Sequence, residues 1–232
     1  LLPSRTPVRS AFLDAVDQIT ITGSDLFVNG AGAAPFESVE IQDDGTNNQL
    51  LAGGSISISS KAADLNDSAI IINGRITTTG GGSTIDVTAN GDVLLGANGD
   101  LTSVDSNITV IADANLDANG GGVMMADGAI VNAGSGQVEV FATDNVAVGA
   151  LVSTLRVTIS TSEGAITDNG DMDQDVTAPD VFLAASTGIG DDANDLDLTV
   201  SRLAALTDSG DIVLTNTGGL EITVLEGLIG VL

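Results

Sequence analysis

The chain has 232 residues and a net charge of −26, because 32 Asp and Glu residues stand against only 6 Lys and Arg. The length suits one or two domains with a sizeable core, and 43% hydrophobic residues exclude an ordinary acidic disordered tail. His, Cys, Trp and Tyr are absent, which excludes Ser-His-Asp and Cys-His nucleophile systems, the common zinc sites and disulfides. Six scattered cations also exclude a nucleic-acid partner.

The choice of acidic residue indicates a turn-rich chain. Only six of the acidic residues are Glu and the others are Asp, which favours turns, whereas Glu favours helices. The 29 Gly residues stand mostly beside Asn, Asp or Ser, where positive φ angles are needed. This composition predicts many short strands joined by tight turns.

Residues 1–35 are predicted to form an N-terminal segment or cap with the first strands. Residues 10–16 fit a short helical turn, with Ser10 as its cap, and the alternating residues 19–21 fit a strand. The chain has no basic, apolar leader and no apolar run long enough to cross a bilayer, so we expect neither a signal peptide nor membrane insertion.

Residues 36–232 are predicted to form a repetitive β-solenoid, part of a longer chain. Two apolar residues flanking one polar residue, the pattern of a strand, recur about every 22 residues, a spacing typical of repeat proteins. The pairs are Val39/Ile41, Ile56/Ile58, Ile85/Val87, Ile108/Val110, Val138/Val140, Val157/Ile159, Val181/Leu183, Leu196/Leu198 and Ile212/Leu214.

Four turns share the form x-[Asn/Ser]-Gly-Asp and lead into apolar or alternating stretches, at residues 89–92, 97–100, 168–171 and 208–211. These turns predict corners, because Asn-Gly supplies left-handed conformations and Asp accepts hydrogen bonds from nearby amides. Asn-Gly also favours hairpins, so a β-sandwich array is the alternative fold. The similarity of residues 84–89, 107–112 and 137–142 favours stacked coils, in which like residues form apolar ladders without aromatic side chains.

The period of two gives each side chain of these units a direction. The polar residues Asp86, Thr109 and Glu139 are predicted to point outward. The aliphatic residues on either side of them are predicted to point into the core: Ile85, Val87, Ile108, Val110, Val138 and Val140.

Residues 83–95 and 209–220 resemble the β-strand repeat regions of large bacterial surface and secreted proteins, namely filamentous-haemagglutinin-like and autotransporter-type adhesins. The resemblance spans roughly residues 36–225. It implies a right-handed parallel β-helix, of about eight to ten irregular coils here, that forms an extended rod at the cell surface or outside the cell. No Pro follows Asn, so the Asn-Pro motifs of the adhesins' secretion domain are missing and the chain corresponds to the shaft.

Two acidic clusters are candidate calcium sites, because calcium needs several oxygen ligands from a short loop. Asp171, Asp173 and Asp175 alternate like the start of a calcium loop, but the Gly and Glu of an EF-hand are missing. Asp191, Asp192 and Asp195 form the second cluster. The alternative for both clusters is a solvated acidic turn, and no other cofactor is expected.

The leading hypothesis is a non-catalytic structural or adhesive shaft segment of a large extracellular bacterial surface protein. Its partners would be neighbouring repeats, further copies of itself, or a cell-surface glycan or protein. One alternative is a self-assembling extracellular filament or surface-layer subunit. The other is a carbohydrate-active β-helix enzyme with Arg156 or Arg202 as base, which the absence of Trp and Tyr disfavours because sugar subsites normally use aromatic stacking.

Overall fold

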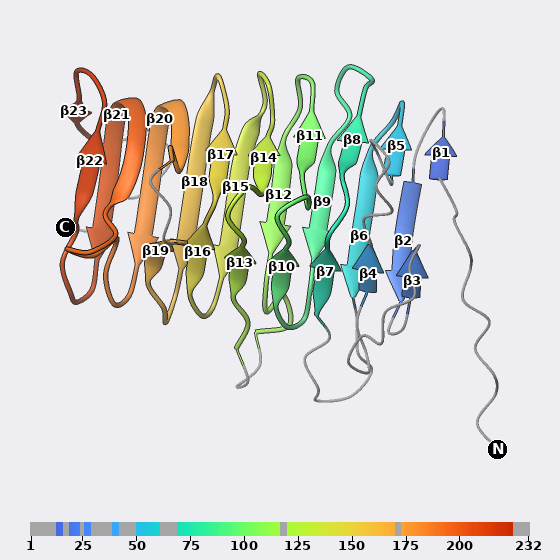
Figure 1. Ribbon diagram of the computed structural model, residues 1–232, viewed down its shortest axis with the longest axis horizontal. Helices are drawn as coiled ribbons and strands as arrows, with labels where there is room; N and C mark the ends of the chain where they lie inside the picture. The colour runs from blue at the N-terminus through green and yellow to red at the C-terminus, as the bar shows by residue number, and fades with distance from the viewer. Residues whose placement is uncertain are drawn as a thin grey trace.

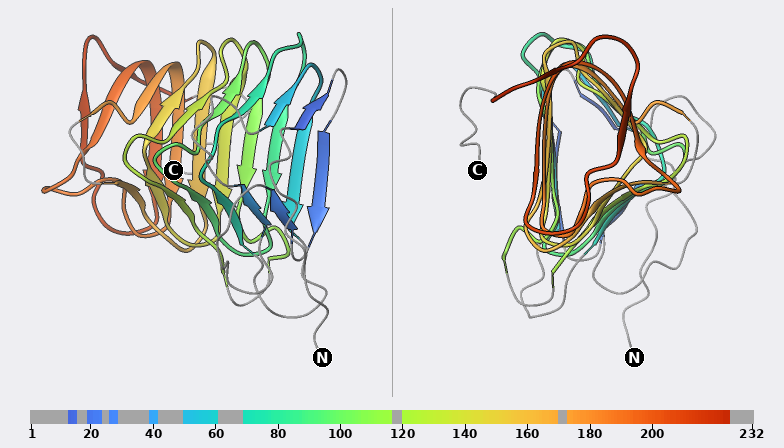
Figure 2. Two further views of the ribbon diagram at one scale, coloured as in Figure 1. Left: turned by 45° about the vertical axis from the view of Figure 1, so that its right-hand side comes forward. Right: turned by 90° about the vertical axis from the view of Figure 1, so that its left-hand side faces the viewer.

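The protein is an all-β parallel β-solenoid. The computed structural model describes residues 13–15, 19–23, 26–28, 39–41, 50–60, 69–116, 120–169 and 173–224, which form strands and turns without a helix. The strands wind about one axis and stack into three columns, so the molecule is triangular in cross-section (Figures 1 and 2). Every pairing between described strands is parallel, as a solenoid requires and a β-sandwich does not allow.

The three columns define three faces of the solenoid. Face 1 contains β1 (Leu13–Ala15), β5 (Leu50–Ala52), β8 (Ile76–Thr78), β11 (Leu101–Ser103), β14 (Ile130–Asn132), β17 (Ala150–Val152) and β22 (Leu214–Asn216). Face 2 contains β2 (Ile19–Gly23), β6 (Ile56–Ser60), β9 (Ile85–Thr88), β12 (Ile108–Ile111), β15 (Gln137–Ala142), β18 (Arg156–Thr161) and β23 (Glu221–Ile222). Face 3 contains β3 (Leu26–Val28), β4 (Val39–Ile41), β7 (Ile70–Ile72), β10 (Val93–Leu95), β13 (Val123–Met125), β16 (Val146–Val148) and β19 (Ile166–Asp168).

Two long strands join faces 1 and 2 into one 16-stranded sheet. These are β20 (Val176–Ala185) and β21 (Leu196–Thr207), whose first halves continue face 1 and whose second halves continue face 2. Face 3 is the separate seven-stranded sheet. The solenoid makes about seven turns, slightly fewer than the eight to ten coils expected.

The predicted apolar ladder runs along the inside of face 2. Ile85, Ile108 and Val138 are register partners, and all six aliphatic residues predicted to point inward are at most 1% exposed. Asp86, Thr109 and Glu139 alternate with them and are more exposed, as predicted. From Ile108 to Val138 the chain advances 30 residues, but from Val138 to Val157 only 19, so the corners absorb the difference in coil length.

The nine apolar pairs all fall on strands or bridges, but they belong to three faces rather than one. Val39/Ile41 lies on face 3 and Leu196/Leu198 on face 1, while Ile212 and Leu214 lie on different faces. The face 2 ladder continues from Val181 to Leu203 and Ile222 instead. The helical turn expected at residues 10–16 is also wrong over its described part, because Leu13–Ala15 is extended and pairs with β5.

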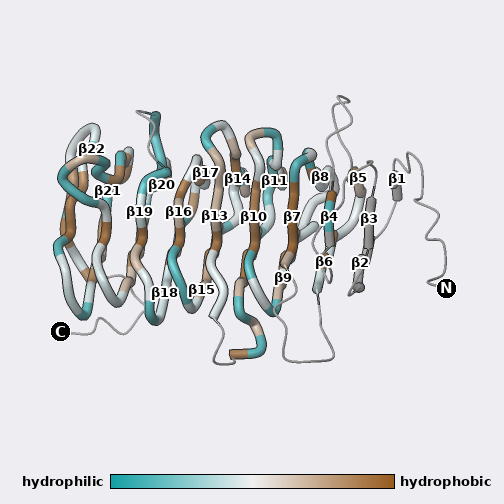
Figure 3. The backbone as a smooth tube through the Cα atoms, turned by 60° about the horizontal axis from the view of Figure 1, so that its bottom comes forward, coloured by the Kyte–Doolittle hydropathy of each residue, from teal (hydrophilic) through white to brown (hydrophobic). Residues whose placement is uncertain are grey.

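Four successive strands of face 3, β7, β10, β13 and β16, are apolar on both sides of the sheet. The register partners that point outward on these strands are Ile71, Leu94, Met124 and Ala147. The residues before and after each of them in its strand are buried in the core. Figure 3 shows the brown, hydrophobic course of β7, β10 and β13. Met124 is 43% exposed. On faces 1 and 2 the outward residue between the two inward residues of β8, β9, β11 and β12 is Thr or Asp.

Asp and Asn side chains at the corners tie neighbouring turns of the solenoid together. Asp92 accepts a hydrogen bond from the amide of Gly122 at 2.8 Å, and Asn145 accepts one from the amide of Ala165 at 2.8 Å. The two members of each pair are 30 and 20 residues apart. Asp and Asn side chains at corners therefore bind backbone amides of the adjacent coil, which gives the abundance of these residues a structural cause.

Candidate functional site

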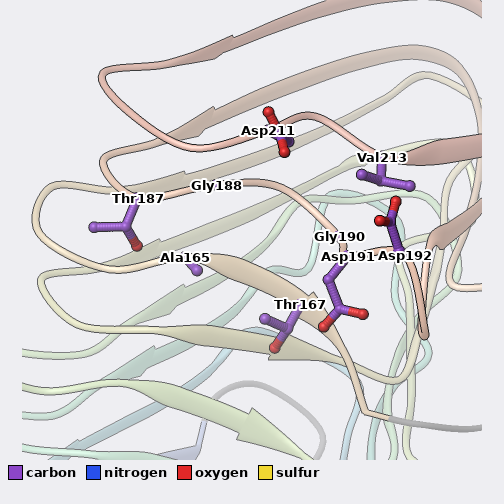
Figure 4. Close-up of a pocket in the computed structure, with 9 residues that line it drawn as sticks. All are labelled: Ala165, Thr167, Thr187, Gly188, Gly190, Asp191, Asp192, Asp211 and Val213. Atoms are coloured by element: carbon purple, nitrogen blue, oxygen red, sulfur yellow. The ribbon is translucent and has the colours of Figure 1, made fainter.

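An acidic pocket of about 360 Å³ opens on the outside of face 3, near the C-terminal end of the described solenoid. Figure 4 shows its lining, which comes from three successive turns of the chain. The residues are Ala165, Thr167, Thr187, Gly188, Gly190, Asp191, Asp192, Asp211 and Val213. Three carboxylates and two hydroxyls thus share one concave site.

The stacking of turns forms this pocket. Ile189 forms parallel bridges with Ile166 of the previous turn and Ile212 of the next turn, so the residues beside them lie next to each other on the outer surface. Gly190 has a φ of 63°, and a Cβ atom there would lie 2.1 Å from the carbonyl oxygen of Val213. This glycine therefore allows the turns that line the pocket to approach closely.

Backbone hydrogen bonds set the electrostatics of the pocket. Asp191 accepts hydrogen bonds from the amides of Ala193 at 2.8 Å and Asn194 at 2.9 Å. These two bonds favour the ionised carboxylate and lower the pKa of Asp191 below its usual value. The pocket thus offers an ionised carboxylate, further oxygen acceptors and small hydroxyl donors.

The predicted calcium ligands occupy different environments. In the second cluster Asp191 and Asp192 line the pocket together, but Asp195, which is not among the lining residues, accepts a hydrogen bond from the Thr215 hydroxyl. In the first cluster Asp171 lies outside the described residues, Asp173 is exposed and Asp175 is buried. Asp175 accepts a hydrogen bond from the amide of Asp197 at 2.7 Å. Across the described residues, no three acidic side chains form a group that could hold a metal ion.

Asp211 is the pocket carboxylate that the sequence did not associate with the site. It belongs to the turn at residues 208–211, which predicted a corner, but nothing local connects it to Asp191 and Asp192. The sequence feature that could have assigned Asp211 to the pocket is its position immediately before Ile212, because Ile212 bridges Ile189 of the previous turn.

The arginines considered as catalytic bases lie on the outside of face 2, away from this pocket. Arg202 donates hydrogen bonds to both carboxylate oxygens of Asp180, with Nε 2.7 Å from Oδ1. Arg156 and Glu221 follow in register on either side of this pair, so charges of opposite sign alternate along the column. This alternation favours a role in holding the register of the strands.

Neither the family models, the curated proteins nor the solved structures that were compared with the chain give a match. The described residues include no helix of the length and apolarity needed to span a membrane.

We expect calcium and magnesium to raise the melting temperature equally at matched ionic strength. Both divalent ions screen the repulsion that accompanies the net charge of −26, and screening depends on ionic strength rather than on the identity of the ion. Thermal melts in the two salts and in matched sodium chloride, with Asp191→Asn and Asp173→Ala beside the unaltered chain, measure this. A calcium preference lost in one variant would instead assign a specific site to that cluster.

Glu40→Gln is expected to raise the melting temperature at pH 7 by a few degrees. Glu40 is only 7% exposed, and its Oε2 is buried with no hydrogen-bond partner among the described residues. Burial raises the pKa of Glu40 above the unfolded value of 4.5, so the contribution of Glu40 to stability is fully present below pH 4.5 and is lost as the pH rises through the folded pKa. Relieving about 1 kcal/mol would shift the midpoint by roughly 2–4 °C.

Melting curves from pH 4 to pH 8 provide the measurement for Glu40→Gln, with Glu163→Gln at an exposed corner as the control. The gain should shrink toward pH 4, where Glu40 is protonated in both states. A gain of equal size at every pH would show that packing rather than ionisation is the cause.

Proposed function

We propose that this chain is a non-catalytic structural shaft segment of a large extracellular bacterial surface protein. The observation that carries the proposal is the uninterrupted stacking of parallel coils over three faces, each tied to the next by backbone and corner hydrogen bonds. Such a stack forms an extended rod, whose length increases by about 4.8 Å with each coil.

The pocket on face 3 lacks the features expected of a catalytic or sugar-binding site, which favours a structural role over that of a carbohydrate-active enzyme. The pocket on face 3 has no aromatic side chain in its lining on which a sugar ring could stack. Asp191, the pocket carboxylate with a lowered pKa, is held in its ionised form by two amides, which does not suit a general acid. Arg202 is engaged by Asp180 rather than placed at the pocket.

Deletion of one whole coil tests the structural part of the proposal. Ile108 and Val138 are register partners, so removing residues 108–137 joins Asn107 to Val138 and brings β9, β10 and β11 against β15, β16 and β17. A shaft should fold after this deletion and become shorter by about 4.8 Å. Removing residues 108–122 instead takes out β12 alone. This deletion should abolish folding, because one coil would then have no strand on face 2 and the strands that follow would no longer meet their register partners.

Antibody labelling of intact cells of the source bacterium tests the location. Intact cells are expected to be labelled without permeabilisation. Labelling that requires permeabilised cells would overturn the proposal, as would collapse of the chain after the whole-coil deletion.

A further inference from the structure

A second pocket, of about 340 Å³, lies on the outside of the solenoid where face 2 turns toward face 3. Its lining comes from three successive turns of the chain, at the ends of β12, β15 and β18. Most of the lining side chains are apolar, and three hydroxyls and one carboxylate stand among them. The volume lies at the lower end of the range of small-molecule sites, about 300–1,000 Å³. The pocket therefore has the size and the mixed lining of a site for a small ligand.

Ile111 and Phe141 are the two large side chains that face 2 contributes to this pocket. They are register partners one position beyond the inner ladder of face 2, so their side chains point outward. The residues in register with them on the two flanking turns are Thr88 and Ser160, which are polar. An aliphatic and an aromatic side chain thus lie together on the outer surface, between turns that carry hydroxyls at the same place.

The loop after β12 supplies two lining residues with strained backbone conformations. Asp113 and Leu116 have φ angles of 53° and 52°, and across the described residues no other residue except glycine has a positive φ. Asp tolerates this left-handed conformation better than Leu, whose side chain gains nothing from it. Backbone strain of this kind concentrates at functional sites. Here both strained residues line one pocket.

Hydrogen bonds hold this loop in place. The amide of Asp113 donates to the carbonyl oxygen of Gly91 in the preceding turn at 3.2 Å, and the amide of Leu116 donates to the carbonyl oxygen of Asp113 at 3.1 Å. Leu116 is nevertheless 81% exposed, so packing in the core does not explain an aliphatic residue at this strained position. A ligand that covers Leu116 would bury its side chain and supply the missing apolar contact.

The polar groups of the pocket are complementary to a cation. Asp113 is only 1% exposed, so water and salt screen its charge less than they screen a surface carboxylate. Asp144 and Glu163 are exposed and each follows a lining residue, whereas no Lys or Arg lines the pocket. Three hydroxyls can accept hydrogen bonds from an ammonium group, and the ring of Phe141 attracts a cation placed over its face. The same groups repel a carboxylate or a phosphate.

We propose that this pocket binds a small organic ammonium ion that carries an aromatic or short aliphatic group. The apolar group packs against Phe141, Ile111 and Leu116, and the ammonium group is attracted by the charge of Asp113 and the rim carboxylates. The site lies on the outer surface, apart from the stacking contacts that carry the structural role proposed above. It therefore adds a binding activity to the shaft.

Methyl NMR titration of the full chain tests the proposal, with phenethylammonium, phenethyl alcohol and hydrocinnamate as probes. The three probes share an aromatic ring and differ in charge, and an ionic strength of about 0.15 M screens diffuse attraction to the acidic surface. Phenethylammonium should shift the methyl resonances of Ile111 and Leu116 and leave those of Val104, an exposed residue at another corner, unchanged. It should bind about tenfold more tightly than phenethyl alcohol, and hydrocinnamate should not bind.

Two variants separate the charge of the pocket from its apolar contact. Asp113→Asn should reduce the affinity for phenethylammonium to that for phenethyl alcohol. Leu116→Asn should weaken the binding of both probes about threefold or more while keeping or raising the melting temperature, because Asn tolerates a positive φ. A purely structural role of Leu116 would not give this combination. Val104→Asn, at a residue that is 58% exposed, is the matched control and should bind both probes like the unaltered chain.

Three outcomes would overturn the proposal. Equal affinities for the three probes would remove the preference for a cation. Shifts of similar size at acidic corners along the whole chain would reduce the binding to diffuse attraction. Unchanged binding in Leu116→Asn would exclude this pocket as the site. The whole-coil deletion and the surface labelling require no ligand, so the proposed function and this proposal can fail separately.

Discussion

Val110→Asp is expected to abolish folding, whereas Thr109→Asp is expected to leave the fold intact. Val110 lies in the inner ladder of face 2 between Val87 and Val140 and is 1% exposed. A carboxylate at this position would be buried among aliphatic side chains without a partner. The cost is on the order of 5 kcal/mol, comparable with the whole stability of many domains.

The neighbouring position provides the matched control for Val110→Asp. Thr109 points outward between Asp86 and Glu139, so an Asp there stays in contact with water. It loses the 3.5 Å hydrogen bond that the Thr109 hydroxyl donates to Glu139 and adds surface repulsion, together about 1 kcal/mol. Far-UV circular dichroism and urea unfolding of the two variants make the comparison. Equal unfolding midpoints would mean that the strand is displaced by one residue and that the inward and outward sets are reversed.

Gly134→Ala is expected to destabilise the protein by about 3 kcal/mol or more, whereas Gly82→Ala should cost about 1 kcal/mol. Both glycines have a positive φ, 56° at Gly134 and 75° at Gly82, so an alanine is strained at either position. They differ in their surroundings. A Cβ atom at Gly134 would lie 1.8 Å from the carbonyl oxygen of Val104 in the adjacent turn, but at Gly82 no atom lies within 4 Å.

Urea denaturation of the two alanine variants isolates the cost of contact between turns. Because the conformational strain is similar at both positions, the difference between the two free energies of unfolding reports the packing of the corner alone. Equal losses would mean that the corner at Gly134 can move away from Val104 and that neighbouring turns are not held at a fixed spacing.

The direction of the inner and outer side chains could be predicted from the sequence. In residues 84–89, 107–112 and 137–142 the alternation of aliphatic and polar residues is local, and a strand converts it directly into two sides. The positions of the corners at Asp-rich turns could also be predicted from the sequence. The parallel stacking followed from the likeness of these units and from the lack of aromatic residues, which a ladder of Ile and Val does not need.

The assignment of each pair to a face depended on the tertiary structure. Leu196/Leu198 and Leu203 have the same local character, but Leu203 stacks on Val181 of the face 2 ladder while Leu198 pairs with Val176 on face 1. All three faces use the same period of two, so only the lengths of the corners determine which pair meets which. Those lengths vary between turns, and the sequence does not mark where a corner ends.

The sequence by itself determined the all-β class, the repetitive core, the corners and the absence of His and Cys chemistry, because each depends on composition or on neighbours within a few residues. Only the tertiary structure placed Asp211 in one pocket with Asp191 and Asp192, buried Glu40 and set Asp113 in the wall of another pocket. Each of these depends on which turn lies above or below a residue. Contacts between neighbouring turns join residues about one coil apart in the sequence. Because the corners differ in length, the sequence does not show which residues these are.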